Sequence, residues 1–394
     1  MKSKIDLFKV SIFLMMFGLL TFEDNIIVCL GTQFFALLLT FFDYYKHKRT
    51  FEKLYFYICW GLLFSLYSGL SIIWASPLNN TVLSNWMSIV QTVVIGFIII
   101  SFCHNENNIS WAVFSFVFAA FAFSIRFFIQ VPVTAWGNGE RFDNDSIFGS
   151  NANAQCLALA ALFSFTYSFK KYKLLKTLVA VLCLLVSSFM GTRSGIVIFS
   201  LGLFFFLIFK AKSFQKRVFM FIMASFALII LLLVFTRISF LYNSVGFRLE
   251  SMLNGLFGYK TDRSTSTRLE FIPEAIRVFM SHPLFGVGLD GFRYENSIQF
   301  SYAHNNYVEI LADLGLVGFF FFYILHFSIF VCMRKAKVKD IFFYCMFICV
   351  LLIDFTTVTF SLEMTFFLLS LLYSYSRLGA VTNNGLCKKT YITA

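Results

Sequence analysis

The stretch YAHNNYVEILADLGLVGFFFF, residues 302–322, places polar side chains directly before a run of hydrocarbon. A histidine and two asparagines occupy positions 304–306, Glu309 and Asp313 follow four residues apart, and four phenylalanines close the stretch. Such a run is typical of a membrane-spanning helix, in which polar groups are costly unless they are paired or used. The fold class therefore depends on whether the whole chain spans a membrane, and the function depends on which side the polar end faces.

Composition places the chain among integral membrane proteins. Of its 394 residues, 59% are hydrophobic, 13% are charged and 57 are Phe, and the mean hydropathy is +0.79. A soluble domain of this length could not bury so much apolar surface. The apolar runs are continuous, as in helices, and do not alternate with a period of two as barrel strands do.

The apolar runs predict an all-α integral membrane protein with about twelve transmembrane helices and one large extracytoplasmic loop. The first run follows a basic stub and precedes no A-x-A-like cleavage site, so we interpret it as a helix and not as a signal peptide. We expect helices one to nine within residues 1–235, the loop with short helices at 236–303, the last three helices within 304–380 and a cytoplasmic tail at 381–394. The expected spans are 8–22, 25–42, 54–74, 86–103, 109–130, 152–169, 175–190, 195–209, 218–235, 308–332, 341–358 and 361–377.

The distribution of charge orients these predicted helices. With the N-terminus inside, alternate connections contain KHKRTFEK (46–53), HNENN (104–108), KKYKLLK (170–176), KAKSFQKR (210–217) and MRKAKVKD (333–340). That side, with both termini, holds 22 Lys or Arg against 5 Asp or Glu, and the other side holds 10 against 15, which together make the net charge of +12. Because short loops rich in Lys and Arg stay cytoplasmic, the basic excess is a topology signal and not a nucleic-acid footprint.

Cysteine usage indicates neither a disulfide framework nor a zinc site. The nine Cys lie in or beside expected helices or in the tail, and none falls in a long outer segment. No Cys and His spacing is that of zinc ligands.

Two long segments fall on the predicted outer side. In the shorter one, 132–150, Trp136, Glu140, Arg141 and Asp143 are candidates to bind sugars by stacking and hydrogen bonds. The longer one, 236–303, is the only large hydrophilic region of the sequence. Any chemistry is therefore expected to face outward.

The longer segment contains a helical pattern followed by a glycine-rich turn. STRLEFIPEAIRVFMSHP (266–283) has helical spacing, with Ser266 or Thr267 as its expected N-cap and Glu270 in a capping box. HPLFGVGLDGF (282–292) contains a literal G-x-G-x-x-G, but no strand precedes it, so the dinucleotide interpretation fails. We expect these glycines to form a tight positive-φ turn that lays the loop on the helix ends.

The order of these motifs resembles a bacterial family. Arg268, SHPLFGVGLDGF (281–292) and AHNNYVEILADLGLVGF (303–319) resemble the largest outer loop of the O-antigen ligase and polysaccharide polymerase superfamily. GTRSG (191–195) resembles its Ser-Arg turn between two helices, and IFGSNANAQCLALA (147–160) its Gly…Asn-x-Asn helix start. The resemblance covers residues 147–320 by motif and implies a GT-C-like glycosyltransferase of the bacterial cytoplasmic (inner) membrane, with its active site facing the exterior.

The resemblance also implies the substrates. The donor is a saccharide linked through a diphosphate to a polyprenol, typically undecaprenol, and the acceptor is a hydroxyl of a lipid-linked repeat unit or of lipid A–core. The family implies no metal ion or other cofactor, no nucleic acid, and, besides the lipid bilayer, a chain-length regulator protein as a partner.

Three residues match the family's catalytic positions. Arg193 and Arg268 match the arginines that neutralise the departing diphosphate, and arginine suits that task because it donates bidentately and stays charged. His304 matches the base that takes the proton of the acceptor hydroxyl. The alternatives are structural: Arg193 reaches outward to water from a turn, Arg268 pairs with Glu270 or Glu274, and His304 lies beside a helix cap.

Further residues are weaker candidates for binding diphosphate or glycan. They are Arg126, Arg277, Arg293, Asn305 and Glu309. Arg126 lies within a predicted span, where an arginine either reaches out to water or binds phosphate. For Arg277 and Arg293 a surface charge is the competing interpretation, and Asn305 is expected to position or cap.

Two classes of function remain open at this point. A transporter of lipid-linked sugars, such as a flippase, should show paired halves, broken helices and charges near the midplane. We find no internal repeat, and the charges gather in one outer loop, which favours the enzyme. Within the enzyme class, the short, Phe-rich chain with modest outer loops favours a polymerase over a ligase.

Overall fold

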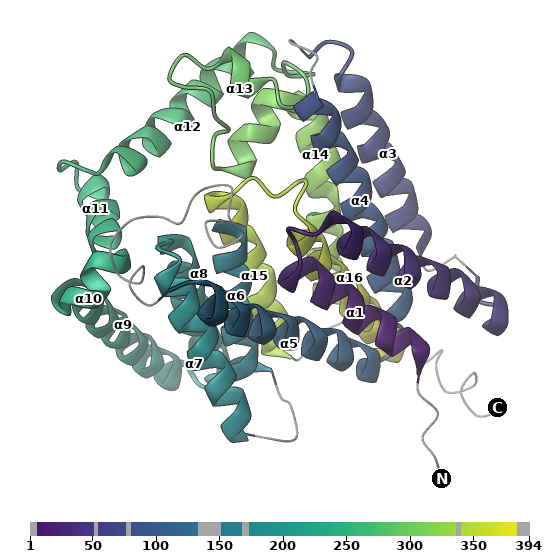
Figure 1. Ribbon diagram of the computed structural model, residues 1–394, viewed down its shortest axis with the longest axis horizontal. Helices are drawn as coiled ribbons and strands as arrows, with labels where there is room; N and C mark the ends of the chain where they lie inside the picture. Colours follow the sequence, from purple (N-terminus) through teal and green to yellow (C-terminus); the bar gives the residue numbers. More distant parts are fainter. Residues whose placement is uncertain are drawn as a thin grey trace. The chain divides into compact units, whose positions relative to one another are not determined.

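In the computed structural model, every regular element of the described residues is a helix. The described residues are 6–50, 54–75, 80–132, 151–167, 173–335 and 340–383. The helices (Figure 1) are α1 Leu7–Thr21, α2 Ile26–His47, α3 Tyr55–Ser71, α4 Asn80–Phe102, α5 Glu106–Gln130, α6 Asn151–Thr166, α7 Lys173–Phe189, α8 Arg193–Lys210, α9 Phe214–Arg237, α10 Ser239–Leu241, the π-helical turn Tyr242–Gly246, α11 Phe247–Leu256, α12 Arg263–Ser281, α13 Phe292–Glu295, α14 Asn306–Lys335, α15 Ile341–Thr356 and α16 Glu363–Asn383.

Each predicted apolar span overlaps one helix. In the described part of the chain, six helices (α2, α4, α5, α8, α9 and α14) are long and apolar enough to cross a membrane. These helices fit the predicted integral membrane protein. Others are shorter: α6 has 16 residues. At 1.5 Å per residue such a helix reaches about 24 Å, less than the ~30 Å of hydrocarbon in a bilayer, so a count of twelve full crossings stays a prediction.

The chain divides into two compact units. Unit 1 comprises Met1–Phe35, Ser110–Ser266 and Tyr344–Ile353, and unit 2 comprises Ala36–Ile109, Thr267–Phe343 and Asp354–Ala394. The centre of unit 1 is α6, which packs on α7 and α8, while α8 also packs on α9. In α6 every residue from Asn153 to Ser164 is buried, so other parts of the chain cover this helix on all sides.

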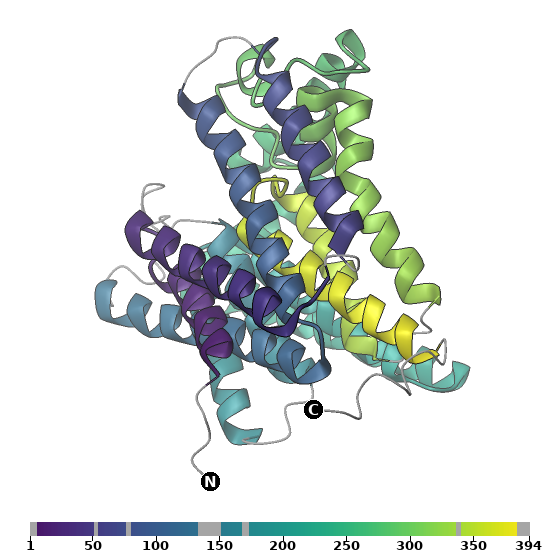
Figure 2. The same ribbon diagram turned by 90° about the vertical axis from the view of Figure 1, so that its right-hand side faces the viewer.

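In unit 2, four helices lie side by side. α3 packs on α4 and α14, and α16 packs on α4 and α14 (Figure 2). Aromatic residues of α3 bind the carbonyls of α14: Trp60 Nε1 donates to Phe321 O at 2.6 Å, and the Tyr67 hydroxyl donates to Leu314 O at 2.7 Å. Each ring thus buries its apolar body while its polar atom finds a partner.

Contacts within unit 2 place its basic connections at one end and its large polar loop at the other, which is the arrangement that the charge pattern predicted. At one end, Arg49 of the basic connection 46–53 contacts the ring of His104, at 3.1 Å between Nη1 and Nδ1. At the other end, Ser71 Oγ accepts from Leu289 N at 3.1 Å, and Thr81 Oγ1 donates to Asp290 at 3.3 Å. The large polar loop therefore lies at the end of the unit opposite its basic connections.

The start of α12 differs from the expectation. The predicted N-cap was Ser266 or Thr267, but the helix begins at Arg263. Thr265 N and Ser266 N both donate to Asp262 O at 3.0 Å, so Asp262 ends the loop and begins the helix. Asp is itself a favoured N-cap residue, and its contacts in unit 1, described below, select it over the later candidates.

Candidate functional site

A break at Gly315 divides α14 into a short polar segment and a long apolar one. Gly315 has φ 64° and ψ −168°, which lie outside the helical region. Residues 306–314 thus form a helix of about two and a half turns before the chain continues as the apolar part. The structure differs here from the predicted continuous span at 308–332.

The loop 283–288 pairs with the backbone groups that the break exposes. Two carbonyls of the short segment and two amides of the long one find partners in it: Val287 N donates to Ala312 O at 3.0 Å, Gly288 N to Asp313 O at 2.8 Å, Leu316 N to Pro283 O at 2.9 Å and Val317 N to Leu284 O at 3.2 Å. Unpaired backbone groups are costly inside an apolar bundle, so these bonds make the break tolerable.

Two glycines allow this close approach. A Cβ on Gly286 would lie 2.3 Å from the Asp313 carbonyl oxygen, and a Cβ on Gly315 would lie 2.3 Å from Leu284 O. Both residues also have positive φ, 67° and 64°, which disfavours any side chain. The predicted positive-φ turn against the helix ends is confirmed at Gly286 and Gly288, whereas Gly291 has φ −72°.

Two buried carboxylates of α14 hold the polar loop. Asp313 accepts from Phe292 N at 2.7 Å and from Asp290 N at 3.0 Å. Glu309 accepts from Ala303 N, directly before His304. Both side chains therefore face the loop before α14 and accept hydrogen bonds from its backbone amides.

Asn305 and Asn306 shape the start of α14. The Asn305 side chain accepts from Tyr307 N at 3.0 Å and from Val308 N at 3.4 Å, which is the geometry of an N-cap. Asn306 accepts from Thr359 N at 2.7 Å and donates to the Tyr323 hydroxyl at 3.0 Å. Asn305 thus occupies the capping position that the sequence predicted, and Asn306 joins α14 to the turn before α16.

His304 is half-buried and sits in a strained turn among aromatic rings. Its φ is 55°, a left-handed value that is uncommon for a residue with a side chain. Its ring centroid lies 4.1 Å from that of Tyr302 and 6.3 Å from that of Phe271 on α12. The imidazole of His304 therefore lies against rings from its own loop and from α12.

Arg293 lies beside the same cluster of rings. Its Nε and Nη2 atoms contact Asp290 Oδ1 at 3.1 and 3.0 Å, and its guanidinium carbon lies 5.8 Å from the Tyr302 ring centroid. Burial raises the pKa of Asp290, and the charge of Arg293 together with hydrogen bonds from neighbouring side chains offsets only part of this effect. Arg293 is thus fixed one ring away from His304.

Arg268 lies on the helix that contacts His304. It is half-buried, and it precedes Phe271 by three residues on α12, which places the two on one face of the helix. Phe271 packs on Phe292 at 6.1 Å between ring centroids. The structure thereby sets Arg268 one helical turn from the residue against which His304 packs.

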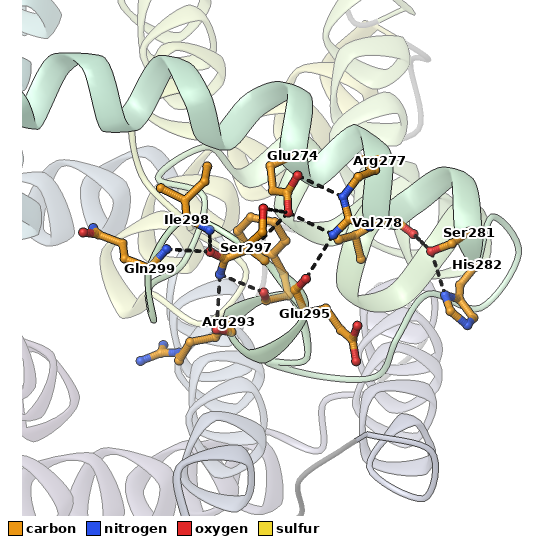
Figure 3. A network of polar contacts seen from close by, with 12 residues as sticks. Glu274, Arg277, Val278, Ser281, His282, Arg293, Glu295, Ser297, Ile298 and Gln299 are labelled. Atoms are coloured by element: carbon orange, nitrogen blue, oxygen red, sulfur yellow. Dashed lines mark hydrogen bonds and ion pairs between the residues drawn. The ribbon is translucent and has the colours of Figure 1, made fainter.

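The second half of α12 binds the loop that follows α13 (Figure 3). Glu274 accepts from Arg277 Nε at 2.9 Å and from Ser297 N at 2.8 Å, and Arg277 Nη2 donates to Glu295 O at 3.1 Å. Arg277 thus pairs with Glu274 and is more than half exposed. Arg293 extends away from this network in Figure 3.

The ion pair of Glu274 should make the stability of the folded protein depend on pH. The hydrogen bond from Arg277, with those from Ser297, outweighs the effect of burial and lowers the pKa of Glu274 to about 2. Because the folded-state pKa lies below the usual 4.5, the stabilisation is complete above pH 4.5 and is lost as the pH falls toward 2. Glu274→Gln should lower stability at pH 7 by about 1 kcal/mol, since exposed pairs are screened, and flatten the decline between pH 4.5 and 2. Thermal unfolding in detergent measures both, and equal pH slopes for variant and wild type would contradict the assignment.

Arg193 belongs to unit 1, where it joins the GTRSG turn to the region before α12. Its side chain is about 10% exposed, Nη1 lies 3.6 Å from Asp262 Oδ1, and it donates to Thr265 Oγ1 and to Arg248 O. Burial raises the pKa of Asp262, but hydrogen bonds from Ser251 and Thr265 and the charge of Arg193 outweigh it, so the pKa stays below its usual value. Arg193 thus contacts three protein groups and does not merely reach outward to water, as the competing interpretation had it.

Arg126 also belongs to unit 1. Its Nη1 and Nη2 atoms bind the two oxygens of Asp24 at 2.9 and 2.7 Å, and its Nε donates to Gln130 at 3.0 Å. The hydrogen bond from Arg126 lowers the pKa of Asp24. This bidentate pair compensates the arginine, so a phosphate would have to displace Asp24 in order to bind there.

The structure thus gathers most predicted site residues in unit 2. The loop before α14 and the start of that helix carry Arg293, His304, Asn305 and Glu309. The neighbouring helix α12 carries Arg268 and Arg277. Unit 1 contains Arg193 and Arg126. Trp136, Glu140, Arg141 and Asp143 lie outside the described residues.

Sequence reasoning missed three residues of this site. Asp290, Phe300 and Tyr302 organise the surroundings of Arg293 and His304. For Asp290 a signal existed, since an Asp directly before a turn glycine tolerates the positive φ of 62° that it adopts. For the two rings, their position within four residues before the histidine was the only sign.

The fold and the site define a helical membrane protein with a polar site built on the broken end of one helix. Residues 177–323 match the family model described as O-antigen ligase. This match confirms the predicted resemblance to the O-antigen ligase and polysaccharide polymerase superfamily, whose members transfer glycans. No curated protein matches the chain.

Proposed function

We propose that the protein transfers a saccharide from a polyprenyl-diphosphate donor to a sugar hydroxyl at the outer face of the bacterial inner membrane. The observation that carries the proposal is the placement of His304 in a packed ring cluster, with Arg293 one ring away and Arg268 on the adjoining helix. This cluster lies at the end of unit 2 opposite the basic connections, and such connections stay cytoplasmic.

The chemistry needs a base and a compensating cation. The acceptor oxygen attacks the anomeric carbon, its proton passes to the His304 imidazole, and the bond from that carbon to the diphosphate oxygen breaks. Negative charge then grows on the departing lipid diphosphate, which a guanidinium stabilises through two parallel hydrogen bonds. Arg268 is our candidate for that role in unit 2, and Arg193 is retained as a second candidate from the family pattern.

Among glycan-transferring enzymes, we favour a polymerase that joins lipid-linked repeat units, with a ligase acting on lipid A–core as the second candidate. Deletion of the gene followed by gel analysis of the surface glycan separates the two. Loss of a polymerase leaves single repeat units on the acceptor. Full-length polymer stranded on its lipid carrier would instead identify a ligase.

A transporter remains the competing class, because a broken helix is one of its features. In transporters, the free ends of the half-helices bind substrate or ions. At Gly315 the loop 283–288 occupies carbonyls and amides on both sides of the break instead. The break therefore serves to anchor the loop that carries the candidate site.

The arginines provide a direct test. Arg268→Ala and Arg193→Ala should each lower product formation by roughly 10²–10³-fold, as loss of a transition-state donor does, while membrane insertion stays normal. Arg268→Lys should rescue poorly because an ammonium lacks the bidentate fork. Arg263→Ala, which removes an exposed arginine from the first turn of α12, is the matched control. Product formation at the wild-type level in both alanine variants would refute the proposed role of the arginines.

A further inference from the structure

A row of aromatic rings and one guanidinium leads away from His304. We call Tyr294, Phe300, Tyr302 and Arg293 the aromatic shelf. Tyr302 lies 4.1 Å from His304, Arg293 lies 5.8 Å from Tyr302 and 5.5 Å from Phe300, and Phe300 meets Tyr294 edge-on at 5.0 Å, all measured to ring centroids. The contacts therefore form one continuous series that begins at the proposed base.

The shelf presents apolar surface in polar surroundings. The Phe300 side chain is 63% exposed. Its neighbours in the segment YENSIQFS (294–301) include the exposed Glu295, Ser297 and Gln299. Such a segment cannot enter hydrocarbon without burying these polar groups, so contact with lipid tails does not account for the exposed ring.

The shelf is also held rigid. The Asn296 side chain donates to Phe292 O, Arg293 O and Ser301 O at 3.0 to 3.2 Å, and it accepts from two amides of the same turn. Glu274 fixes Ser297 from α12 (Figure 3). A surface organised before binding loses little conformational entropy when a ligand arrives.

Arg293 adds hydrogen-bonding capacity to the rings. Asp290 holds its Nε and Nη2 atoms, and no described residue accepts a hydrogen bond from its Nη1 atom. An exposed ring beside a fixed N–H donor matches the chemistry of a pyranose, which has an apolar face of C–H groups and a rim of hydroxyls. A lipid tail would leave the donor unpaired, which is costly.

We propose that the aromatic shelf binds a pyranose ring of the acceptor glycan beside His304. This inference rests on the proposed function and names the part of the same site that recognises the acceptor. Donor diphosphate is expected beside Arg268, so the shelf affects acceptor affinity and leaves the chemical step unchanged.

Kinetics with a soluble acceptor test the shelf. The probe is the repeat-unit oligosaccharide released by mild acid from the host's lipid-linked pool, offered to purified full-length protein with the native lipid-linked donor. Phe300→Ala should raise the acceptor KM roughly tenfold and change kcat by less than about twofold, because stacking is lost in ground state and transition state alike. Phe300→Tyr should keep the wild-type KM. Phe285→Ala, which removes another exposed Phe from the same loop region, should also keep it.

The outcomes separate the shelf from the proposed function. An unchanged acceptor KM in Phe300→Ala, with His304→Ala inactive, overturns the shelf and leaves the transfer reaction in place. An effect of Phe300→Ala confined to detergent extraction or protein yield assigns the ring to lipid contact and also overturns the shelf. Full activity of His304→Ala overturns the proposed function itself.

Discussion

Replacing His304 by alanine should reduce the rate of glycan transfer by about 10²–10⁴-fold, the contribution expected of a general base. The ring packs on Tyr302 and Phe271 and lies directly before the N-cap of α14, so alanine removes the proton acceptor and leaves the backbone bonds of the turn in place. Transfer per milligram of purified protein is the measurement. Added imidazole should restore part of the rate, which a purely structural loss would not allow.

The matched control for this result is His282→Ala. His282 lies in the same loop, is exposed, and its Nδ1 atom contacts Ser281 Oγ at 3.0 Å. We expect this variant to retain the wild-type rate. A His304→Ala protein that transfers glycan as fast as wild type would remove the base from the account.

Gly315→Ala should prevent stable folding of unit 2. The new Cβ would lie 2.3 Å from Leu284 O, and φ would have to stay at 64°. Relief requires the loss of the bonds from Leu316 N and Val317 N, so we expect destabilisation by about 4 kcal/mol, a large share of typical protein stability. Thermal unfolding and the yield of monodisperse protein in detergent measure this loss.

Gly31→Ala is the control for the glycine substitution. Gly31 lies within α2, and no atom lies within 4 Å of a Cβ built there. Alanine in a helix interior is neutral or slightly stabilising relative to glycine, so yield and unfolding temperature should hold. If Gly315→Ala is as stable as this control, the close pairing of loop and broken helix is wrong.

The sequence predicted the parts of the protein that local patterns determine. Continuous apolar runs located the helices, the position of Asn305 before an apolar run indicated its cap, and the glycine-rich stretch indicated a positive-φ turn. Each of these features depends on a few neighbouring residues, which a single sequence displays.

The parts that the sequence did not predict depend on contacts between distant residues. A glycine within an apolar run is ordinary, and the break at Gly315 exists because residues 283–288 supply its hydrogen bonds. Glu309 was predicted to bind diphosphate or glycan, but it accepts from the backbone amide of Ala303, and Asp313 likewise accepts from backbone amides of the loop. The predicted N-cap of α12 was wrong because contacts with Arg193 and Ser251 hold Asp262 at the start of the helix.

Transfer in the absence of any sealed compartment tests the central claim most directly. Purified protein in detergent is incubated with the lipid-diphosphate-linked saccharide and its acceptor, and the glycan product is resolved on a gel. The account predicts elongated or transferred glycan with wild type, and none above background with His304→Ala or Arg268→Ala. Absence of transfer by well-folded wild-type protein, together with movement of the same lipid-linked sugar across sealed vesicles, would contradict it and identify a transporter.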